Sequence, residues 1–158
     1  MRDAKNNKRL LLADPVYNSR LVTRLINRVM KDGKKSIAIK QVYEAFKYIG
    51  EQTKQPAEEV FRVALENIKP VMEVRSRRVG GAAYQVPTPV RGDRRESLAI
   101  RWLVTCSRLR PNKEFHHFYL KLATEIIAAS KNEGETLKKK DNMHKMAEAN
   151  KAFAHFRW

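Results

Sequence analysis

The most constraining feature of the chain is the segment 71–90, in which two stretches of strand-forming residues flank a pair of glycines. Gly80 and Gly81 can supply the positive φ angles that a tight hairpin turn requires. Pro87 and Pro89 are two positions apart, so their missing N–H groups face the same edge of the second strand. That edge cannot pair with a third strand. The sequence therefore predicts a two-stranded ribbon, and other elements must supply the core because an isolated ribbon is marginal in water.

Amphipathic stretches on both sides of the ribbon are predicted to supply that core, because apolar residues recur in them at helical spacing. We expect helices over residues 21–30, 36–49, 56–68, 93–110, 115–127 and 135–151. The predicted fold class is mainly α: a single domain, 1–158, of about six helices, with one projecting β-ribbon, 71–90, between the third and fourth helices. Residues 1–14 are expected to form an extended basic arm and residues 152–158 a C-terminal tail.

Individual residues indicate where some of these helices begin and end. Ser19 stands at the N-cap position of the first helix, and Gly33 follows its last apolar residues. Gly50 is expected to end the second helix. Asp93 and Glu96 have the spacing of a capping box at the start of the fourth. These signals divide the chain into short helices joined by short connections.

Positive charge is the second strong constraint, because 33 Lys and Arg residues face 17 Asp and Glu residues, a formal net charge of +16. A small ligand rarely requires so many uncompensated cations, whereas a polyphosphate does. The excess is uneven: residues 36–68 hold four basic and five acidic side chains (net −1), and residues 69–101 hold eight and three (net +5). The charge therefore predicts a nucleic-acid partner and a neutral scaffold at 36–68.

The sequence holds no group of residues that indicates catalysis. It lacks the G-x-x-x-x-G-K-[ST] and G-x-S-x-G motifs, and its one cysteine, Cys106, falls on an apolar helix face, as an inert buried thiol does. His116 and His117 are adjacent and would point apart on a helix. We interpret His144 and Glu148 as a salt-linked pair instead of a metal site. We expect a protein that is not an enzyme and that needs no cofactor or metal.

Membrane and secretory signals are also missing from the sequence. No apolar stretch approaches the ~18 residues of a membrane span, and the run at 10–13 is too short for a signal peptide. One cysteine cannot form a disulfide framework within the chain. The expected location is the cytoplasm, with no membrane partner.

The arrangement of the basic residues favours RNA. Four of them fall within an arc of roughly 80° on the first helix: Arg20, Arg24, Arg28 and Lys31. Three lie near the tip of the ribbon: Arg75, Arg77 and Arg78. Arg outnumbers Lys seven to one over residues 69–101, and Arg both binds phosphates bidentately and stacks on exposed bases. Such stacking suits RNA, whose deep major groove a helix cannot read.

A DNA-binding alternative stays open at this point. The second helix follows a short turn, but it is nearly neutral and would make a poor recognition helix. A basic ribbon can instead bend DNA through the minor groove. The alternative hypothesis is a DNA-bending architectural protein that uses the ribbon 71–90.

Five stretches of the sequence carry a more specific signal. They are 21–24 (LVTR), 30–36 (MKDGKKS), 69–90, 99–103 (AIRWL) and 144–158 (HKMAEANKAFAHFRW). Neither EVRSRRVGG at 73–81 nor the C-terminal block follows from generic helix or hairpin chemistry. In their order and register over nearly the whole chain, these stretches resemble the bacterial small-subunit ribosomal protein seven family.

The resemblance implies a structural protein of the ribosome, built as six helices with one projecting β-ribbon. It implies direct binding to the 3′ major domain of 16S ribosomal RNA, where the family nucleates assembly of the small-subunit head. The ribbon and the last helix would lie at the subunit interface, near the exit-site tRNA and the messenger RNA. Small-subunit ribosomal proteins nine and eleven are the implied protein neighbours.

The resemblance also implies which side chains face each RNA. The residues expected to bind ribosomal RNA are Arg2, Lys5, Lys8, Arg9, Arg20, Arg24, Arg28, Lys31, Lys34, Lys35, Arg75, Arg77, Arg78, Arg91, Arg94, Arg95 and Arg101. The residues expected near tRNA and messenger RNA are Arg78, Val79, Gly80, Gly81, Ala82, Tyr84, Lys138, Lys139, Lys140 and His144.

Overall fold

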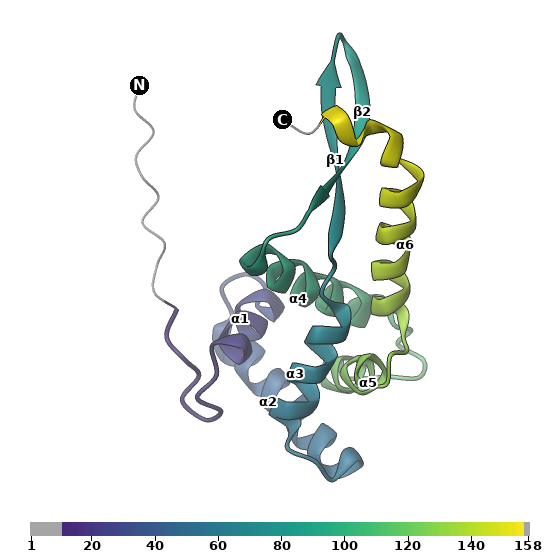
Figure 1. Cartoon of the computed structure of the whole chain (residues 1–158). Coiled ribbons are helices and arrows are strands. Elements are labelled where there is room, and N and C mark those ends of the chain that lie inside the picture. Colours follow the sequence, from purple (N-terminus) through teal and green to yellow (C-terminus); the bar gives the residue numbers. More distant parts are fainter. Residues whose placement is uncertain (1–10, 157–158) are drawn as a thin grey trace, which may run out of the picture.

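A computed structural model describes residues 11–156 and shows a body of helices from which one β-ribbon projects (Figure 1). In chain order the elements are α1 (Arg20–Val29), α2 (Lys35–Thr53), α3 (Ala57–Ile68), β1 (Met72–Val79), β2 (Ala82–Pro89), α4 (Gly92–Leu109), α5 (Phe118–Ser130), α6 (Glu135–Ala149) and a 3₁₀ helix, η1 (Lys151–Phe156). The antiparallel pair β1–β2 is the only sheet in the described part of the chain. The predicted mainly helical class, with a ribbon between the third and fourth helices, is confirmed.

The hydrophobic core lies among α1 to α5. Helix α5 packs against α2, α3 and α4, and α1 packs against α2 and α4. The rings of Phe46 and Phe61 meet inside this body, with centroids 5.5 Å apart. Trp102 on α4 is only 4% exposed, and Leu98 and Leu103 are buried beside it. The inward faces predicted from helical spacing are therefore the faces that pack.

The expected end of α2 at Gly50 is wrong. The helix continues through Gly50 to Thr53 and stops at Lys54, whose backbone is left-handed with φ 54°. Ile49 is fully buried, and the Thr53 hydroxyl donates a hydrogen bond to the Ile49 carbonyl at 2.7 Å. Packing and this hydrogen bond outweigh the cost of about 1 kcal/mol that a glycine imposes inside a helix.

The capping box predicted at the start of α4 is also wrong. The N-cap position belongs to Arg91, so Asp93 lies inside the first turn. The carboxylate of Glu96 pairs with Arg24 of α1, so it is turned away from the helix end. Asp93 still favours the helix, because an acidic side chain in the first turn opposes the positive end of the helix dipole.

Helix α5 begins at Phe118, later than the predicted 115. The side-chain oxygen of Gln41 on α2 accepts the backbone N–H of Tyr119 at 3.1 Å and so satisfies one donor of the first turn. The buried Lys121 donates to the Arg110 carbonyl at 2.5 Å, which folds the preceding segment back as a loop. The two adjacent histidines therefore precede the helix instead of lying on it.

A buried carboxylate joins α5 to the start of α6. Glu125 is 0% exposed and accepts hydrogen bonds from Arg110 Nε at 2.8 Å, from the Thr136 N–H at 2.9 Å and from the Thr136 hydroxyl at 2.6 Å. Gly134, just before α6, has φ 99°, and a Cβ there would lie 3.0 Å from Glu125 Oε1. Only glycine combines that backbone with that approach, so α6 leaves the body in one fixed direction.

The ribbon has the register that its prolines and glycines predict. Pro87 lies opposite Val74 and Pro89 opposite Met72, and no third strand joins them among residues 11–156. The turn is made by Gly80 and Gly81, with φ 58° and 89°. Positive φ at both central positions matches the right-handed twist of the two strands.

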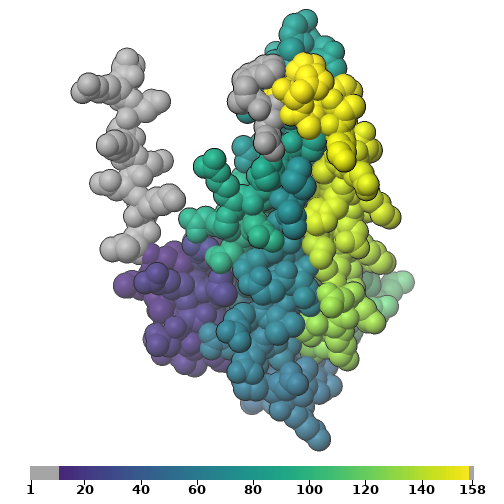
Figure 2. All heavy atoms as spheres, in the orientation of Figure 1, coloured from purple at the N-terminus to yellow at the C-terminus, as the bar shows by residue number. Residues whose placement is uncertain are grey.

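The ribbon is covered along one side, which the sequence did not indicate. Helix α6 and η1 lie along it from the body toward the tip (Figure 2). Val86 on β2 is fully buried, and the Tyr84 ring packs on Phe153 and Phe156 of η1 with centroid distances of 5.2 Å. The expected tail at 152–158 thus begins within a helix that packs on the ribbon.

We predict that Trp102→Ala lowers the free energy of unfolding by about 3–5 kcal/mol, because it removes a large buried ring and leaves a cavity. Urea denaturation followed by circular dichroism would measure the loss. Leu109→Ala is the matched control: Leu109 lies on the same helix but is 78% exposed, so it should change stability by less than about 0.5 kcal/mol. Equal losses in both variants would contradict the assignment of α4's inner face.

Candidate nucleic-acid interface

The predicted basic residues divide into unpaired side chains and side chains that already have partners within the chain. Arg2, Lys5, Lys8 and Arg9 lie outside the described residues. Nine of the others have no hydrogen-bond or ion-pair partner for their side chain among residues 11–156: Arg20, Arg28, Lys31, Lys34, Lys35, Arg77, Arg78, Arg91 and Arg101. An unpaired cation keeps its full hydrogen-bonding capacity for an external anion.

The first group of unpaired cations lies on α1 and in the turn that follows it. Arg28 is exposed in the last turn of α1, where it also complements the helix dipole. The turn to α2 is tight, with positive φ at Asp32 and Gly33 (51° and 70°), and it presents Lys34 and Lys35 to solvent. The turn therefore extends the basic side of α1 around the end of the helix.

Arg24 is an exception within the predicted stripe on α1. It pairs with Glu96 and lies 3.7 Å from Asp93, both on α4. Arg24 thus ties α1 to the start of α4. The predicted stripe is divided: Arg20, Arg28 and Lys31 remain available, whereas Arg24 is used inside the fold.

A surface hollow lies between α1 and α4. It is lined by Leu11, Arg24, Asn27, Arg28, Asp93, Ser97 and Ile100. The hollow therefore places Arg28 of α1 on the same face of the body as the start of α4.

The beginning of the chain's described part is fixed by Asp14. Its carboxylate accepts the backbone N–H groups of Val16 and Tyr17, both at 3.1 Å, and the Tyr43 hydroxyl at 2.9 Å. Burial, followed by the hydrogen bond to Asp14, raises the pKa of the Tyr43 hydroxyl to about 12. Tyr17 packs edge-on against Phe46, with centroids 5.0 Å apart. The point where the arm leaves the core is therefore set by buried contacts.

The arginine side chains at the base of the ribbon have partners within the chain, whereas those at its tip have none among residues 11–156. The prediction that Arg75 lies near the tip is wrong, because Arg75 stands midway along β1 and turns back to Glu73. At the base, Arg75 and Arg94 both bind the buried carboxylate of Glu73, and Arg95 Nε donates to the Pro70 carbonyl at 3.0 Å. At the tip, Arg78 and the glycine turn are exposed. Of the residues expected near tRNA and messenger RNA, Gly80, Gly81 and Ala82 are exposed and Val79 and Tyr84 are half-buried.

The basic residues of α6 do not form one patch. Lys138 pairs with Glu135 at 2.6 Å, and this hydrogen bond raises the pKa of the lysine. Lys140 donates to the Asn67 carbonyl at 2.6 Å and so binds the end of α3. Lys139 is exposed. In Figure 1, α6 lies on the other side of the ribbon from α1, so these lysines are separate from the α1 face.

His144 has a different partner from the one expected. Its Nε2 accepts the backbone N–H of Val71, at the root of β1, at 3.1 Å. The predicted salt-linked pair with Glu148 is not observed, because the imidazole turns toward the ribbon. The residue therefore holds the ribbon root against α6.

Sequence reasoning missed three residues that position this surface: Glu73, Phe153 and Phe156. Glu73 is the one acidic residue between 71 and 90, and an acid among arginines was a signal that could have been used. The two phenylalanines gave no comparable signal, because a short aromatic segment has no periodicity that names its partner.

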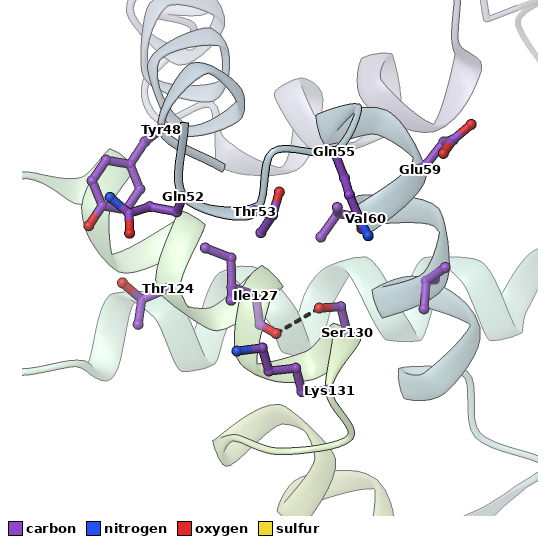
Figure 3. Close-up of a pocket in the computed structure, with 11 residues that line it drawn as sticks. Tyr48, Gln52, Thr53, Gln55, Glu59, Val60, Thr124, Ile127, Ser130 and Lys131 are labelled. Atoms are coloured by element: carbon purple, nitrogen blue, oxygen red, sulfur yellow. Dashed lines mark hydrogen bonds between the residues drawn. The ribbon is translucent and has the colours of Figure 1, made fainter. Parts of the chain in front are cut away.

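Another surface hollow lies at the end of the body away from the ribbon (Figures 1 and 3). It is formed by the end of α2, the start of α3 and the end of α5, and amide and hydroxyl groups such as those of Gln52, Thr53 and Thr124 line it. Ser130 is satisfied by the Ile127 carbonyl at 2.7 Å. The charged side chains of the hollow are one acid, Glu59, and one base, Lys131.

Potential metal and thiol chemistry is limited in the described residues. Residues 11–156 contain no group of three or more His, Cys, Asp or Glu side chains placed to share a metal ion. Burial raises the pKa of the Cys106 thiol, which keeps it in the unreactive protonated form. None of the helices in this range has the length and apolar character of a membrane span.

A helical body with a ribbon and unpaired cations on α1, the turn after it, the ribbon tip and α4 suits the binding of a polyanion. Comparison with known proteins defines the class further. The family model for ribosomal protein S7p/S5e matches residues 1–151. The chain belongs to this family, whose members are structural ribosomal proteins and not enzymes.

Individual relatives agree with the family match over the whole chain. The small ribosomal subunit protein uS7 of Lactococcus lactis subsp. cremoris (strain MG1363) is 56% identical over 158 residues, which is 100% of both chains. The protein of the same name from Ureaplasma parvum serovar 3 is 54% identical over the same span. That from Streptococcus mutans serotype c is 58% identical over 151 residues, 96% of this chain and 95% of the relative.

Arg75 is paired and Arg77 and Arg78 are not, so reversing their charges should have different effects on the free energy of unfolding. Arg75→Glu places a second carboxylate beside the buried Glu73, so we expect a loss of about 1–3 kcal/mol in the free energy of unfolding. The double variant Arg77→Glu, Arg78→Glu reverses unpaired charges and should change it by less than about 0.5 kcal/mol. Urea denaturation of the three proteins measures both. A larger loss in the double variant would show that the tip arginines, not Arg75, stabilise the ribbon.

Proposed function

We propose that the protein is a structural component of the small ribosomal subunit that binds the 3′ major domain of 16S ribosomal RNA directly and nucleates assembly of the head. The family match over residues 1–151 is the observation that carries this proposal. Relatives that align over the full chain are named as small ribosomal subunit proteins. The subunit is cytoplasmic, and the chain would act there as one RNA-binding unit.

The proposed ribosomal RNA surface runs from the N-terminal arm across α1 and α4 to the ribbon. Its free donors are the unpaired side chains of α1, the α1–α2 turn, Arg77, Arg78, Arg91 and Arg101, which suit phosphate contacts. Arg24 and Arg95 are held by the fold, so their part in binding would be smaller or indirect. The neutral segment 36–68, which forms most of α2 and α3, lies outside this surface.

The proposed tRNA and messenger RNA surface consists of the ribbon tip with the exposed part of α6. Gly80, Gly81 and Ala82 let a nucleic-acid backbone approach closely, and Arg78 and Lys139 supply charge. We also propose contacts with small-subunit ribosomal proteins nine and eleven, on the basis of the family resemblance. The hollow at the far end of the body carries no excess positive charge, which suits a protein neighbour better than RNA.

Footprinting of the pure protein on full-length 16S ribosomal RNA tests the main proposal. We expect nucleotides of the 3′ major domain to be protected, and duplex DNA to compete poorly. The control is the same RNA with duplex DNA in increasing excess at fixed salt, since affinities for nucleic acids depend steeply on salt. Equal competition by DNA would favour the DNA-bending alternative, and protection confined to another domain would overturn the assignment of the 3′ major domain.

The ribbon tip gives a second test on the same RNA. The double variant Arg77→Glu, Arg78→Glu should bind at least about tenfold more weakly, a change of about 1.4 kcal/mol, because two available cations become anions. Filter binding at fixed salt measures it. Lys40→Glu, Lys47→Glu is the matched control, with the same charge change on exposed residues of α2. If both variants lose affinity equally, the effect is net charge and the tip has no specific role.

A further inference from the structure

The base of the ribbon contains a buried acid in a strongly basic surface. Glu73 lies in β1, is 4% exposed and is the one acidic residue between 71 and 90. Its cross-strand neighbour Thr88 is also buried and donates its hydroxyl to the Glu73 carbonyl at 3.4 Å. Burying a carboxylate is costly unless it is paired, so the partners of Glu73 indicate why an acid is placed here.

Two arginines from different elements share this carboxylate. Arg75, two residues along β1, places Nε and Nη2 each 2.5 Å from Glu73 Oε1. Arg94, in the first turn of α4, places Nε 2.9 Å from Oε1 and 2.8 Å from Oε2. One carboxylate thus brings together two guanidinium groups that would otherwise repel each other.

The pair keeps much of its donor capacity. The side chain of Arg75 is 51% exposed and that of Arg94 is 47% exposed. A guanidinium has five N–H donors in a rigid fork, and Glu73 uses only part of each fork. The three groups together carry a net charge of +1. Two adjacent, half-exposed guanidiniums with that charge fit one phosphate group in a bidentate manner.

We propose that Glu73 is a positioning residue whose buried carboxylate holds Arg75 and Arg94 as one phosphate-binding site at the base of the ribbon. The inference rests on the proposed RNA-binding function and names the group that the ribbon base would bind. Pre-orientation lowers the entropy lost when the arginine side chains are fixed on a ligand. Arg95, held by the Pro70 carbonyl, lies at the same base and limits movement of the α4 start.

For the variant Glu73→Gln, the proposal predicts a change in RNA affinity opposite to the one that net charge alone predicts. Glu73→Gln raises the net charge by one and should strengthen RNA binding if only charge matters. If Glu73 positions the arginines, the same change weakens binding, because the amide NH₂ of glutamine is a donor and cannot hold a second guanidinium. We expect binding to full-length 16S ribosomal RNA to weaken about tenfold, the size of one hydrogen bond to a charged group.

The matched control is Glu51→Gln, which makes the same charge change on an exposed residue of α2. This control should bind as tightly as the unmodified protein, or slightly more tightly. The slope of log K against log salt should become shallower by about one for Glu73→Gln only, as expected when one phosphate contact is lost. If Glu73 only stabilised the fold, Glu73→Gln would lower the melting temperature but leave the salt dependence of RNA binding unchanged.

A second variant keeps the proposal testable if Glu73→Gln does not fold. Arg94→Lys retains the charge and an ion pair with Glu73 but removes the fork, so it should also bind about tenfold more weakly. In the double variant Glu73→Gln, Arg94→Lys, the two losses of affinity should not add, because both changes act on one site. Tight binding by Glu73→Gln or by Arg94→Lys would overturn the inference. Failure of the unmodified protein to bind 16S RNA would instead overturn the proposed function.

Discussion

The placement of α6 depends on the hydrogen bonds of one buried carboxylate, that of Glu125. It joins the loop after α4, through Arg110, to α5 and to the first turn of α6. A fully buried acid with one partner removed would leave an uncompensated charge, so the three elements are held together or lost together. Because α6 starts from this joint, the joint also decides where α6 meets the ribbon, as it does where His144 binds the N–H of Val71.

The net charge of +16 is less available than its size suggests. Arg24, Arg75, Arg94, Arg110, Lys121, Lys138 and Lys140 bind carboxylates, carbonyls or an amide oxygen of the chain itself. These cations hold the helices and the ribbon at fixed angles. Among the described residues predicted to bind ribosomal RNA, the unpaired ones lie on α1, in the turn after it, at the start of α2, on α4 and at the ribbon tip. Some basic residues therefore build the surface and others are left to bind, and exposure alone does not separate the two groups.

Local patterns predicted the elements well, and long-range contacts explain where prediction failed. The ribbon, its turn at Gly80 and Gly81 and the six helices follow from propensity, periodicity and two proline positions. The late start of α5 and the partner of His144 each depend on a residue distant in sequence. The extension of α2 past Gly50 depends instead on the burial of Ile49 and on a local hydrogen bond from Thr53. The basic regions could be named from composition, but which arginines are paired depends on where Glu73 and Glu96 lie in the folded chain.

The packing of η1 on the ribbon affects the order in which parts of the chain fold during synthesis. Strand β2 ends at Pro89, whereas η1, which packs on Tyr84, begins only at Lys151. During synthesis the two strands leave the ribosome long before the helix that packs on Tyr84. A two-stranded ribbon is marginal in water, so the nascent ribbon stays exposed until the C-terminal helices have emerged. Final ordering of the ribbon is thus a late event in the life of each new chain, after the five-helix body has the residues it needs to fold.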